Sequence, residues 1–556
     1  MEKRNRYSPE LRERAVQCVN FRLLNNTLGV GLIIAILIGS FACVKEKSQN
    51  NLLLVTLDTQ RADHLSCYGS SLVATPNLDY IADQGILFEQ CYSPIPITLP
   101  AHGSLFFSQP PHEFHCYNNG EKVESDEKRP SLASIFKKNG YATAAFTSLG
   151  VLQAKFGLAE GFEHYEGTFP NKGRFYIPAE EVNNLAFPWI EQNQDKPIFL
   201  WIHYSDPHSP YYPPYLPPGL KLFFNDEYIG EYHLNKTHYK IDLELKAGNN
   251  VIRLEIDNPH LNNPQIHQAV FNRLSLIDLS DKTPLEFSSV DGLNFIEPAE
   301  VTQLMREGTI VIDNTLGPRK IRFSFQGKFF LHDKKKREFY QDEVAYLDRE
   351  FGRLIAKLKE LEMFEKTNLV IVGDHGEGLG EYLNEKGNRD FGHINYLYNF
   401  YLRVPLIFSG PDVIFQGERS STPVTLIDVA PSIMTMMGLK QFSHFRGRDV
   451  FSLTEDDDYR LLQATYAPQA DQTKFAFFTR DWHLILTPAH QKYELYALKE
   501  DPLDKHDLYD PENLPAEVNN LVSELNAVAI DILSNKSVNK VSKQTEEMLK
   551  ALGYIR

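Results

Sequence analysis

The chain has 556 residues, of which 42% are hydrophobic and 23% are charged, and its formal net charge is −16. This length exceeds a single ordinary core, so we expect two or three globular domains. The negative charge argues against a nucleic-acid partner, because a duplex binder needs a basic surface that displaces counterions.

The first fifty residues differ in character from the rest of the chain. A basic stretch over residues 1–22 precedes an apolar run from Leu28 to Cys43, LGVGLIIAILIGSFAC. Its length fits the hydrophobic region of a signal sequence better than a full membrane span, which needs about 20 residues. The run ends in small residues before Cys43, which is similar to a bacterial lipoprotein cleavage site, and an uncleaved signal anchor is the alternative. Both predict a membrane-anchored, extracytoplasmic protein of the cell envelope.

From Asn51 onward, short apolar runs alternate with helical stretches. The runs NLLLVTLD, ATAAFTS, PIFLWIHYSD, NLVIVGDHGEG and VPLIFSG are typical of strands buried on both faces of a sheet. SLASIFKKN and FYQDEVAYLDREFGRLIAKLKELEMF have helical periodicity. The pattern predicts an α/β fold with a doubly wound, mixed but mostly parallel sheet, built from residues 51–218 and 331–440. Such sheets bind ligands at the carboxyl ends of their strands.

Residues 219–330 interrupt this pattern. KLFFNDEYIGEY, YKIDLELKAGNNVIRLEIDN and IRFSFQGKFF read as short alternating strands with turn residues, which predicts an inserted β-sandwich. LKAGNN followed by VIRLEI resembles the strand–turn–strand of jelly-roll carbohydrate-binding modules, so glycan binding and simple packing against the body are both open for this insert. Residues 441–556 are expected to form a small C-terminal α+β subdomain.

Four segments far apart in sequence carry oxygen or imidazole groups at strand ends or in loops. The residues are Asp58, Thr98, Asp206 with His208, and Asp374 with His375. Each alone is compatible with a turn or a helix cap. Together they offer carboxylates, imidazoles and a hydroxyl, a set that suits a divalent metal ion and an activated nucleophile.

An ordered series of motifs makes the interpretation more specific. NLLLVTLDTQRADHLSCYG, TPNLDYIADQGILFEQCYS, TLPAHGSL, SDPHSPYYPP, GDHGEGLGE, RVPLIFSG, VTLIDVAPSIMTMMGL and YELYALKEDPLDKHDL follow one another from Asn51 to Asp510. In this order they resemble the sulfatase family of the alkaline phosphatase superfamily, interrupted only by the β insert. The resemblance implies a metal-dependent hydrolase of phosphate or sulfate esters.

The resemblance also implies roles for individual residues. Asp58, Asp374 and His375 match metal ligands, and Thr98 occupies the position of the nucleophile beside the metal. His208 and His393 match positions that bind the anionic ester or assist the leaving group. Arg61, His102 and Asn119 are expected near the substrate.

Three departures from the family pattern bear on the chemistry. Conventional sulfatases carry a Cys or Ser, followed by x-Pro-x-Arg, that is converted to formylglycine, whereas this chain has Thr98 and, in place of the arginine, His102. Asp58 is followed by Thr59 rather than by a second aspartate, and the GKWH segment is missing. All three resemble the phosphodiesterase and phosphotransferase relatives, so we expect Thr98 to attack phosphorus directly.

Several alternatives stay open at this point. One metal ion (Mn, Ca, Mg or Zn) is expected, and a second ion on Asp206, His208 and His393 is the alternative. The anionic ester could belong to a lipid headgroup or a glycan. An atypical sulfatase and a non-catalytic glycan-binding surface protein are the rival functions. The five cysteines show no CxxC spacing, and one bridge among Cys67, Cys91 and Cys116 is conceivable.

Overall fold

The structure is a computed structural model. It describes residues 49–124, 128–167, 175–209, 211, 219–233, 235–257, 268–286, 289–296, 301–330, 333–383, 387–454, 457, 459–466, 472–535, 545 and 549. The apolar run predicted to be a signal or anchor, residues 28–43, lies outside the described residues. Within the described part of the chain, no helix is both long and apolar enough to cross a membrane.

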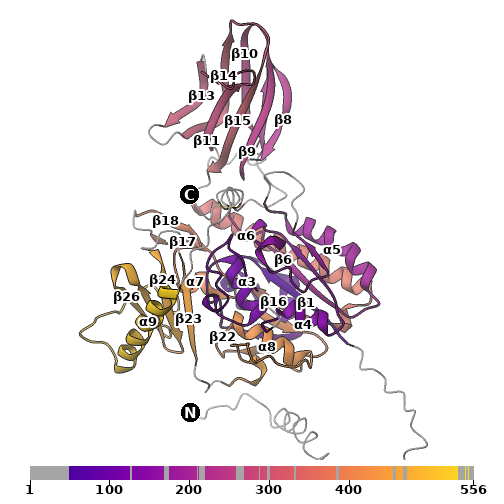
Figure 1. Cartoon of the computed structure of the whole chain (residues 1–556), viewed down its shortest axis with the longest axis vertical. Helices are drawn as coiled ribbons and strands as arrows, with labels where there is room; N and C mark the ends of the chain where they lie inside the picture. Colours follow the sequence, from indigo (N-terminus) through magenta and orange to yellow (C-terminus); the bar gives the residue numbers. More distant parts are fainter. Residues whose placement is uncertain are drawn as a thin grey trace, which may run out of the picture. The chain divides into compact units, whose positions relative to one another are not determined.

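An eight-stranded mixed sheet forms the centre of the body, in the order β21-β2-β20-β16-β1-β6-β4-β5 (Figure 1). β16, β1, β6, β4 and β5 run parallel, and β20 is antiparallel to both of its neighbours. This confirms the predicted α/β class. The strands are β1 (Asn51–Leu57), β2 (Gly85–Phe88), β4 (Ala142–Thr147), β5 (His164–Glu166), β6 (Ile198–Tyr204), β16 (Thr367–Gly373), β20 (Leu406–Ser409) and β21 (Glu418–Ser420).

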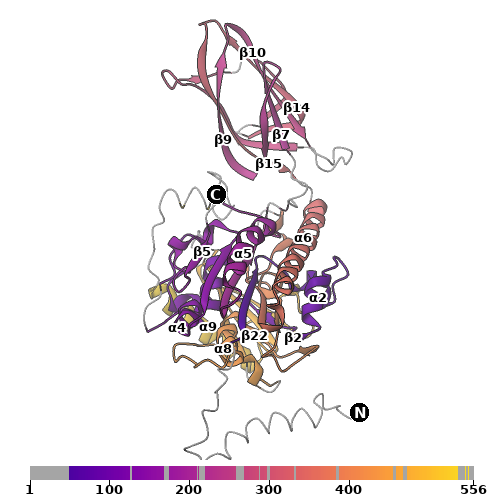
Figure 2. The ribbon, with the colours of Figure 1, turned by 90° about the vertical axis from the view of Figure 1, so that its right-hand side faces the viewer.

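Helices cover both faces of this sheet, because alternate side chains of each buried strand point to opposite sides (Figure 2). Leu52 and Leu54 of β1 join one core with α3 (Thr98–Phe107), α4 (Leu132–Lys138) and α8 (Leu426–Met436). Leu53 and Val55 join a second core with α2 (Pro76–Ala82), α5 (Ala179–Asn193) and α6 (Asp333–Glu360). The short helix α7 (Asn399–Leu402) leads into β19 (Arg403–Val404), which pairs with β3 (Cys91–Tyr92), itself parallel to β22 (Val424–Thr425).

The segment Gly219–Phe330 forms a separate antiparallel sheet of nine strands, in the range where the sequence predicts an insert. Among the described residues, its apolar core consists of side chains of this segment, for example Leu222, Ile252 and Phe323. The strands are β7 (Gly219–Phe224), β8 (Glu227–His233), β9 (Asn235–Leu245), β10 (Gly248–Asp257), β11 (Gln268–Asp278), β12 (Pro284–Leu285), β13 (Ser289–Ile296), β14 (Val301–Asn314) and β15 (Arg319–Phe330). The status of this β insert as an independent domain stays a prediction.

The C-terminal part combines a four-stranded antiparallel sheet with one helix. The sheet follows chain order, with β23 (Arg460–Thr465), β24 (Lys474–Thr479), β25 (Trp482–Thr487) and β26 (Lys492–Ala497), and α9 (Ala516–Asn535) packs on β24 and β25. It shares a core with the body, since Phe475 and Leu486 belong to the same apolar cluster as α3. Two short hairpin strands near the site are β17 (Gly378–Leu383) and β18 (Arg389–Gly392).

The three cysteines of the described residues are free thiols. Cys91 and Cys116 are buried and Cys67 is partly buried. The disulfide left open by the sequence is therefore not formed among the described residues.

Candidate active site

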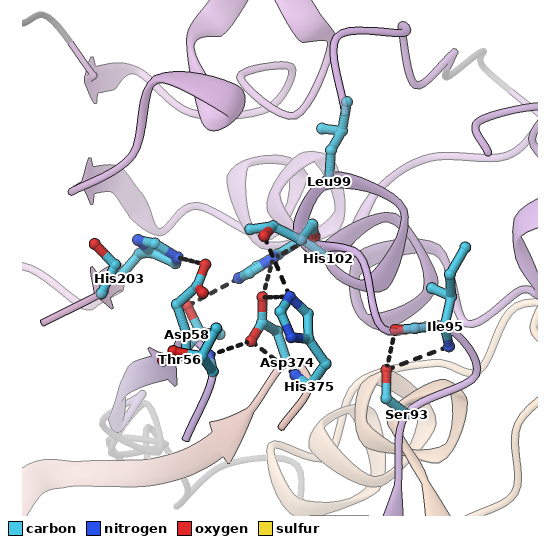
Figure 3. A network of polar contacts seen from close by, with 12 residues as sticks. Thr56, Asp58, Ser93, Ile95, Leu99, His102, His203, Asp374 and His375 are labelled. Carbon is cyan, nitrogen blue, oxygen red and sulfur yellow. Dashed lines mark hydrogen bonds and ion pairs between the residues drawn. The ribbon is translucent and has the colours of Figure 1, made fainter. Parts of the chain in front are cut away.

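Two carboxylates meet at the carboxyl end of the central strands. β1 and β16 are parallel neighbours in a register that pairs Leu57 with Gly373, so the next residues, Asp58 and Asp374, emerge side by side. Ligand atoms of Asp58, Asp374 and His375 all lie within 4.8 Å of one another, and all three side chains are buried (Figure 3). The structure thus assembles the predicted ligand set from segments more than 300 residues apart in the sequence.

The donor set of these three residues fits a divalent cation. Asp58 Oδ1 and Asp374 Oδ2 are buried and have no hydrogen-bond partner among the described residues. Asp374 Oδ1 accepts hydrogen bonds from the main-chain N–H groups of Thr59 (3.2 Å) and His375 (2.7 Å), which fixes the carboxylate. His375 Nδ1 donates to Gly376 O at 3.0 Å, so its Nε2 presents a lone pair.

Two carboxylates buried this close to each other are costly to ionise together. Burial, together with the charge of Asp58, raises the pKa of Asp374 well above its usual range. Burial acts to raise the pKa of Asp58, but the hydrogen bond from His203 and the neighbouring imidazoles of His208 and His375 together outweigh it, and this pKa lies well below its usual range. Burial lowers the pKa of His375 to about 3, so its imidazole is neutral.

Thr98 begins helix α3 beside this cluster. Its buried Oγ1 lies 3.3 Å from His375 Nε2. The preceding residue, Ile97, is extended, so the chain turns into the helix at Thr98 itself. Unpaired N–H groups at a helix N-terminus favour negative charge, which suits an anionic group held next to Thr98. Hydroxyl, imidazole and carboxylates therefore converge as the sequence predicts.

Asn119 supports the first turn of α3 and offers one more donor. Its Oδ1 accepts a hydrogen bond from the main-chain N–H of Leu99 at 2.9 Å. Its Nδ2 is buried and has no partner among the described residues. An amide N–H held beside Thr98 is suited to an ester oxygen, and the substrate-binding role of Asn119 stays a prediction.

His102 lies behind Thr98, with its Nδ1 3.7 Å from Asp374 Oδ2. Its Nδ1 donates to Thr98 O at 2.8 Å, and its Nε2 accepts from Thr56 Oγ1 at 3.1 Å. Trp201 Nε1 donates to the same Thr56 hydroxyl at 2.9 Å, which fixes this tautomer. Burial lowers the pKa of His102 to about 3. Because both ring nitrogens are engaged by protein atoms, the geometry favours a positioning role over the predicted substrate contact.

Arg61 is likewise engaged by protein groups. Its guanidinium makes a two-pronged contact with Asp63 (2.9 and 2.7 Å), donates to Glu377 O at 3.1 Å and contacts the Glu381 carboxylate. The guanidinium also lies over the Phe400 ring, 5.2 Å from its centroid. Arg61 is thus tied to the loop that follows the metal ligands, and the geometry favours positioning over direct substrate binding.

His393 and His208 lie next to His375 of the candidate metal site. The His393 ring lies 4.3 Å from that of His375 and 5.2 Å from that of His208, between ring centroids. His393 Nδ1 is hydrogen-bonded to Glu377 Oε2 at 2.7 Å, and Tyr211 donates its hydroxyl to Glu377 Oε1. Burial raises the pKa of Glu377 to about 8 and lowers that of His393 to about 4. The structure thereby forms a Tyr211–Glu377–His393 chain pointing to the site.

Asp206 does not join this cluster. Its Oδ1 accepts from Ala179 N, at the start of α5, at 3.1 Å and from the Tyr176 hydroxyl at 3.3 Å. Among the described residues, Asp58, Asp374 and His375 are the one group of three or more such ligands that gathers in this way. The alternative second ion on Asp206, His208 and His393 therefore has no assembled site here.

Three functional contributors escaped the sequence analysis. His203 donates through Nε2 to Asp58 Oδ2 at 3.3 Å, with its Nδ1 accepting from Ser148 N. Glu377 and Tyr211 orient His393. His203 lies near the end of a predicted strand, and Glu377 lies two residues after His375 in GDHGEG. Their positions near strand ends could therefore have predicted that both lie close to the site. Tyr211 gave none, because its partner is 166 residues away.

Comparison with known proteins agrees with this geometry. The sulfatase family profile matches residues 50–439, more than half of the chain. The chain belongs to the sulfatase family. A second profile, N-sulphoglucosamine sulphohydrolase, C-terminal, matches residues 387–531 of this sulfatase-family chain. It is accordingly an ester-hydrolysing enzyme, and members of its superfamily use a divalent metal ion.

Individual relatives are distant but cover most of the chain. N-acetylglucosamine-6-O-sulfatase of Bacteroides thetaiotaomicron is 22% identical over 84% of this chain and 83% of its own length. The solved structure of BT4656 in complex with D-glucosamine-2-N,6-O-disulfate has a TM-score of 0.57 at 16% identity, covering 88% of this chain and 99% of that one. The phosphonate monoester hydrolase of Agrobacterium radiobacter has a TM-score of 0.54 at 15% identity, covering 88% and 96%. At these identities the solved structures show the fold.

Proposed function

We propose that this sulfatase-family enzyme hydrolyses a phosphate ester or phosphodiester through a covalent phosphothreonine at Thr98. The observation that carries the proposal is the identity and placement of that residue: an unmodified threonine hydroxyl, 3.3 Å from His375 Nε2, at the start of α3. The same place in conventional sulfatases holds the formylglycine precursor, according to the resemblance described above.

Threonine favours phosphate for a chemical reason. A sulfate ester on a formylglycine hydrate leaves by elimination, because the same carbon carries a second hydroxyl. Thr98 has one oxygen on Cβ, so a sulfate bound there has no such exit. A phosphate on Thr98 needs no elimination, since water displaces it by attack at phosphorus.

Asp58, Asp374 and His375 would hold the divalent ion. Once bound, the ion supplies positive charge that lowers the pKa of the Thr98 hydroxyl and offsets the charge of the transferring group. His203 holds Asp58, and two main-chain N–H groups hold Asp374, so the ligands are fixed before substrate arrives. Asn119 Nδ2 and the first turn of α3 donate to the ester's oxygens.

His393 assists the leaving oxygen in this proposal. Thr98 Oγ1 forms a bond to phosphorus, the bond from phosphorus to the organic oxygen breaks, and His393 gives that oxygen a proton. The Thr98 hydroxyl passes its own proton to solvent, so the His393–Glu377 pair is left one proton short after the first half. In the second half His393 takes a proton from the attacking water, the water oxygen bonds to phosphorus, the bond from phosphorus to Thr98 Oγ1 breaks, and Thr98 regains a proton from solvent. His208, beside His393, contacts the anionic ester.

The organic half is proposed to be a glycan or a lipid headgroup outside the cytoplasm. Two considerations support this: the predicted N-terminal signal or anchor over residues 1–50, and relatives named for sugar sulfates. Because those relatives are named as sulfatases, a sulfate ester is the second candidate for the substrate of this enzyme.

The test compares initial rates on an aryl phosphate monoester, an aryl phosphodiester and an aryl sulfate. Wild type, Thr98→Ala and the conservative Thr98→Ser are each assayed with EDTA and with added Mn, Ca, Mg or Zn. We expect metal-dependent phosphoester turnover that falls more than about a thousandfold in Thr98→Ala and is partly retained in Thr98→Ser. Acid quenching during turnover should yield a tryptic peptide with a phosphorylated Thr98. Turnover of the sulfate alone would reject the phosphoester proposal and establish the second candidate.

A further inference from the structure

A cavity of about 530 Å³ lies away from the metal ligands, between the body and the C-terminal sheet. The body contributes residues next to β3 and β19, and the C-terminal part contributes the turn between β24 and β25 and the segment after β26. None of Asp58, Thr98, Asp374 or His375 lines it. Its volume is that of a small-ligand site, sufficient for a sugar-sized molecule.

Charge distinguishes this cavity from the rest of the molecule. Its walls carry four cationic side chains, Arg403, Arg419, Arg480 and Lys499, against two carboxylates, Glu89 and Asp481. The excess is positive although the whole chain carries a net charge of −16. A concave, positively charged surface attracts small anions and raises their local concentration.

Two of the arginines are fixed in place. Arg403 donates through Nε and Nη2 to Glu89 O at 3.0 and 2.8 Å, and Arg419 donates to the Glu89 carboxylate at 2.9 Å and to Cys67 O at 2.8 Å. Guanidinium groups held in this way lose little freedom on meeting a planar or tetrahedral anion. Arg419 thus balances the Glu89 carboxylate, and a third arginine of the wall, Arg480, donates to Asp457 O at 3.0 Å.

The remaining wall combines apolar and aromatic side chains with the amides of Gln90 and Asn399. Tyr92 lines the cavity and packs on Phe478 with ring centroids 4.0 Å apart, and Leu498 and Pro502 lie beside it. A main-chain hydrogen bond from Leu498 N to Asp481 O (2.9 Å) joins the segment after β26 to the turn between β24 and β25. An anionic group against fixed arginines, with an organic body against this wall, matches the cavity's chemistry.

We propose that this cavity is a second binding site, which takes a sugar-sized organic anion bearing a carboxylate, sulfate or phosphate group. The inference is independent of which ester the active site hydrolyses. The anion is either a free molecule or a second charged unit of a longer substrate chain.

Binding is tested by calorimetry on the full chain in the Thr98→Ala background with EDTA, so that turnover and metal-dependent binding are removed. The probes are glucose 6-phosphate, glucose 6-sulfate, glucuronate and uncharged glucose. The cavity variant is Arg480→Glu with Lys499→Glu. The matched control is Lys138→Glu with Lys440→Glu, the same charge change at exposed positions outside the cavity.

We expect at least one charged sugar to bind, and its dissociation constant to rise about tenfold or more in the cavity variant alone. Thermal melting of both variants checks that they are folded. The proposal is overturned if no charged sugar binds, if uncharged glucose binds equally well, or if the cavity and control variants bind alike.

A second experiment distinguishes a free anion from a unit of the substrate chain. The cavity substitutions are placed in an otherwise wild-type enzyme, and KM is measured for a monosaccharide ester and for a polyanionic oligosaccharide ester of the kind that the enzyme turns over. A KM raised in the cavity variant for the oligosaccharide alone assigns the cavity to the substrate chain. Unchanged KM values for both esters, with sugar binding lost, assign it to a free molecule. Failure of the Thr98 chemistry would leave the binding experiment unaffected, so the two proposals fail separately.

Discussion

The orientation of His393 depends on a residue that touches neither metal nor nucleophile. Glu377 is held between the Tyr211 hydroxyl and His393 Nδ1, and its main-chain oxygen accepts from Arg61. All of these groups are buried. A buried carboxyl–imidazole pair fixes which ring nitrogen faces the site, and so determines whether His393 can pass a proton to the leaving oxygen.

We predict that Glu377→Gln lowers kcat by about tenfold to a hundredfold, with little change in KM. The loss should be large for an alkyl phosphate ester and small for 4-nitrophenyl phosphate, whose leaving group needs no proton. Steady-state rates on both substrates measure this, with Tyr211→Phe as the milder control. An equal loss on both substrates would show that Glu377 acts on the fold rather than on His393.

At the residue scale, the sequence was sufficient to locate the side chains whose chemical types suit metal binding and nucleophilic attack. These side chains lie at strand ends or at the start of a helix, which are positions that hydrophobic periodicity and sequence motifs predict. They are Asp58, Thr98, Asp374 and His375. The engagement of Arg61 by Asp63 and of His102 by Thr56 could not be foreseen, because a side chain's partners depend on packing between distant segments. The same limit hid the contact between His203 and Asp58.

At the scale of elements, the register of β1 against β16 creates both the candidate metal site and its strain. Two carboxylates that follow paired residues of parallel strands are forced together in a buried place. Thr59, directly after Asp58, has φ of 54°, a left-handed conformation that is uncommon for a β-branched residue. Tyr340 holds it by donating its hydroxyl to Thr59 O at 2.7 Å. The strained backbone at Thr59 lowers the stability of this segment, and it is retained because it fixes the geometry of the two carboxylates.

We predict that Asp374→Asn melts at a higher temperature than wild type when both are in EDTA, by about 2 °C or more. The variant removes one of two repelling buried carboxylates, yet its amide oxygen still accepts from Thr59 and His375. Added metal should raise the melting temperature of wild type and not of the variant. Asp195→Asn, at an exposed position, is the control. A variant that melts below wild type in EDTA would contradict the argument.

Helix α5 depends on a carboxyl group from another element. Asp206 accepts from Ala179 N at the start of the helix, and burial raises the pKa of Asp206 to about 7. In an unfolded chain an aspartate has a pKa of about 3.9. The folded state therefore binds a proton that the unfolded state has lost, and this contribution to stability is present at low pH and disappears as the pH rises.

The expected result is a free energy of unfolding that falls between about pH 4 and pH 7 in wild type, relative to Asp206→Asn. Asparagine keeps the oxygen that accepts from Ala179 and cannot ionise. Urea unfolding of both proteins in EDTA across this range measures the difference, in which other titrating groups cancel. A difference that does not vary with pH would show that Asp206 titrates normally.

At the scale of the whole molecule, the β insert and the body have separate hydrophobic cores among the described residues. The β insert packs Leu222, Ile252 and Phe323 into a core of its own, whereas the C-terminal sheet contributes to the core of the body. Alternating apolar and polar residues predicted the insert, because an antiparallel sheet with one buried face needs that pattern. The cavity beside Arg403 and Lys499 had no such signal, since it exists only where the body and the C-terminal sheet meet.

We predict that replacing Gly219–Phe330 by a short Gly/Ser linker leaves a folded enzyme. Its melting temperature and its turnover of a small aryl ester should change little, because the excised core is self-contained. The excised segment, expressed separately, should unfold cooperatively. Calorimetry of all three proteins measures this. Loss of the body's transition in the shortened enzyme would show that the insert is an integral part of the body.

The place of the insert also sets an order of events during synthesis. β1, β6, β4 and β5 leave the ribosome before the insert, but β16, the other neighbour of β1, follows it. Until β16 arrives, β1 is an open edge of an apolar half-sheet, a state prone to mispairing. Translation therefore exposes this edge for as long as the ribosome takes to make the whole insert, and Asp58 and Asp374 cannot meet before that interval ends.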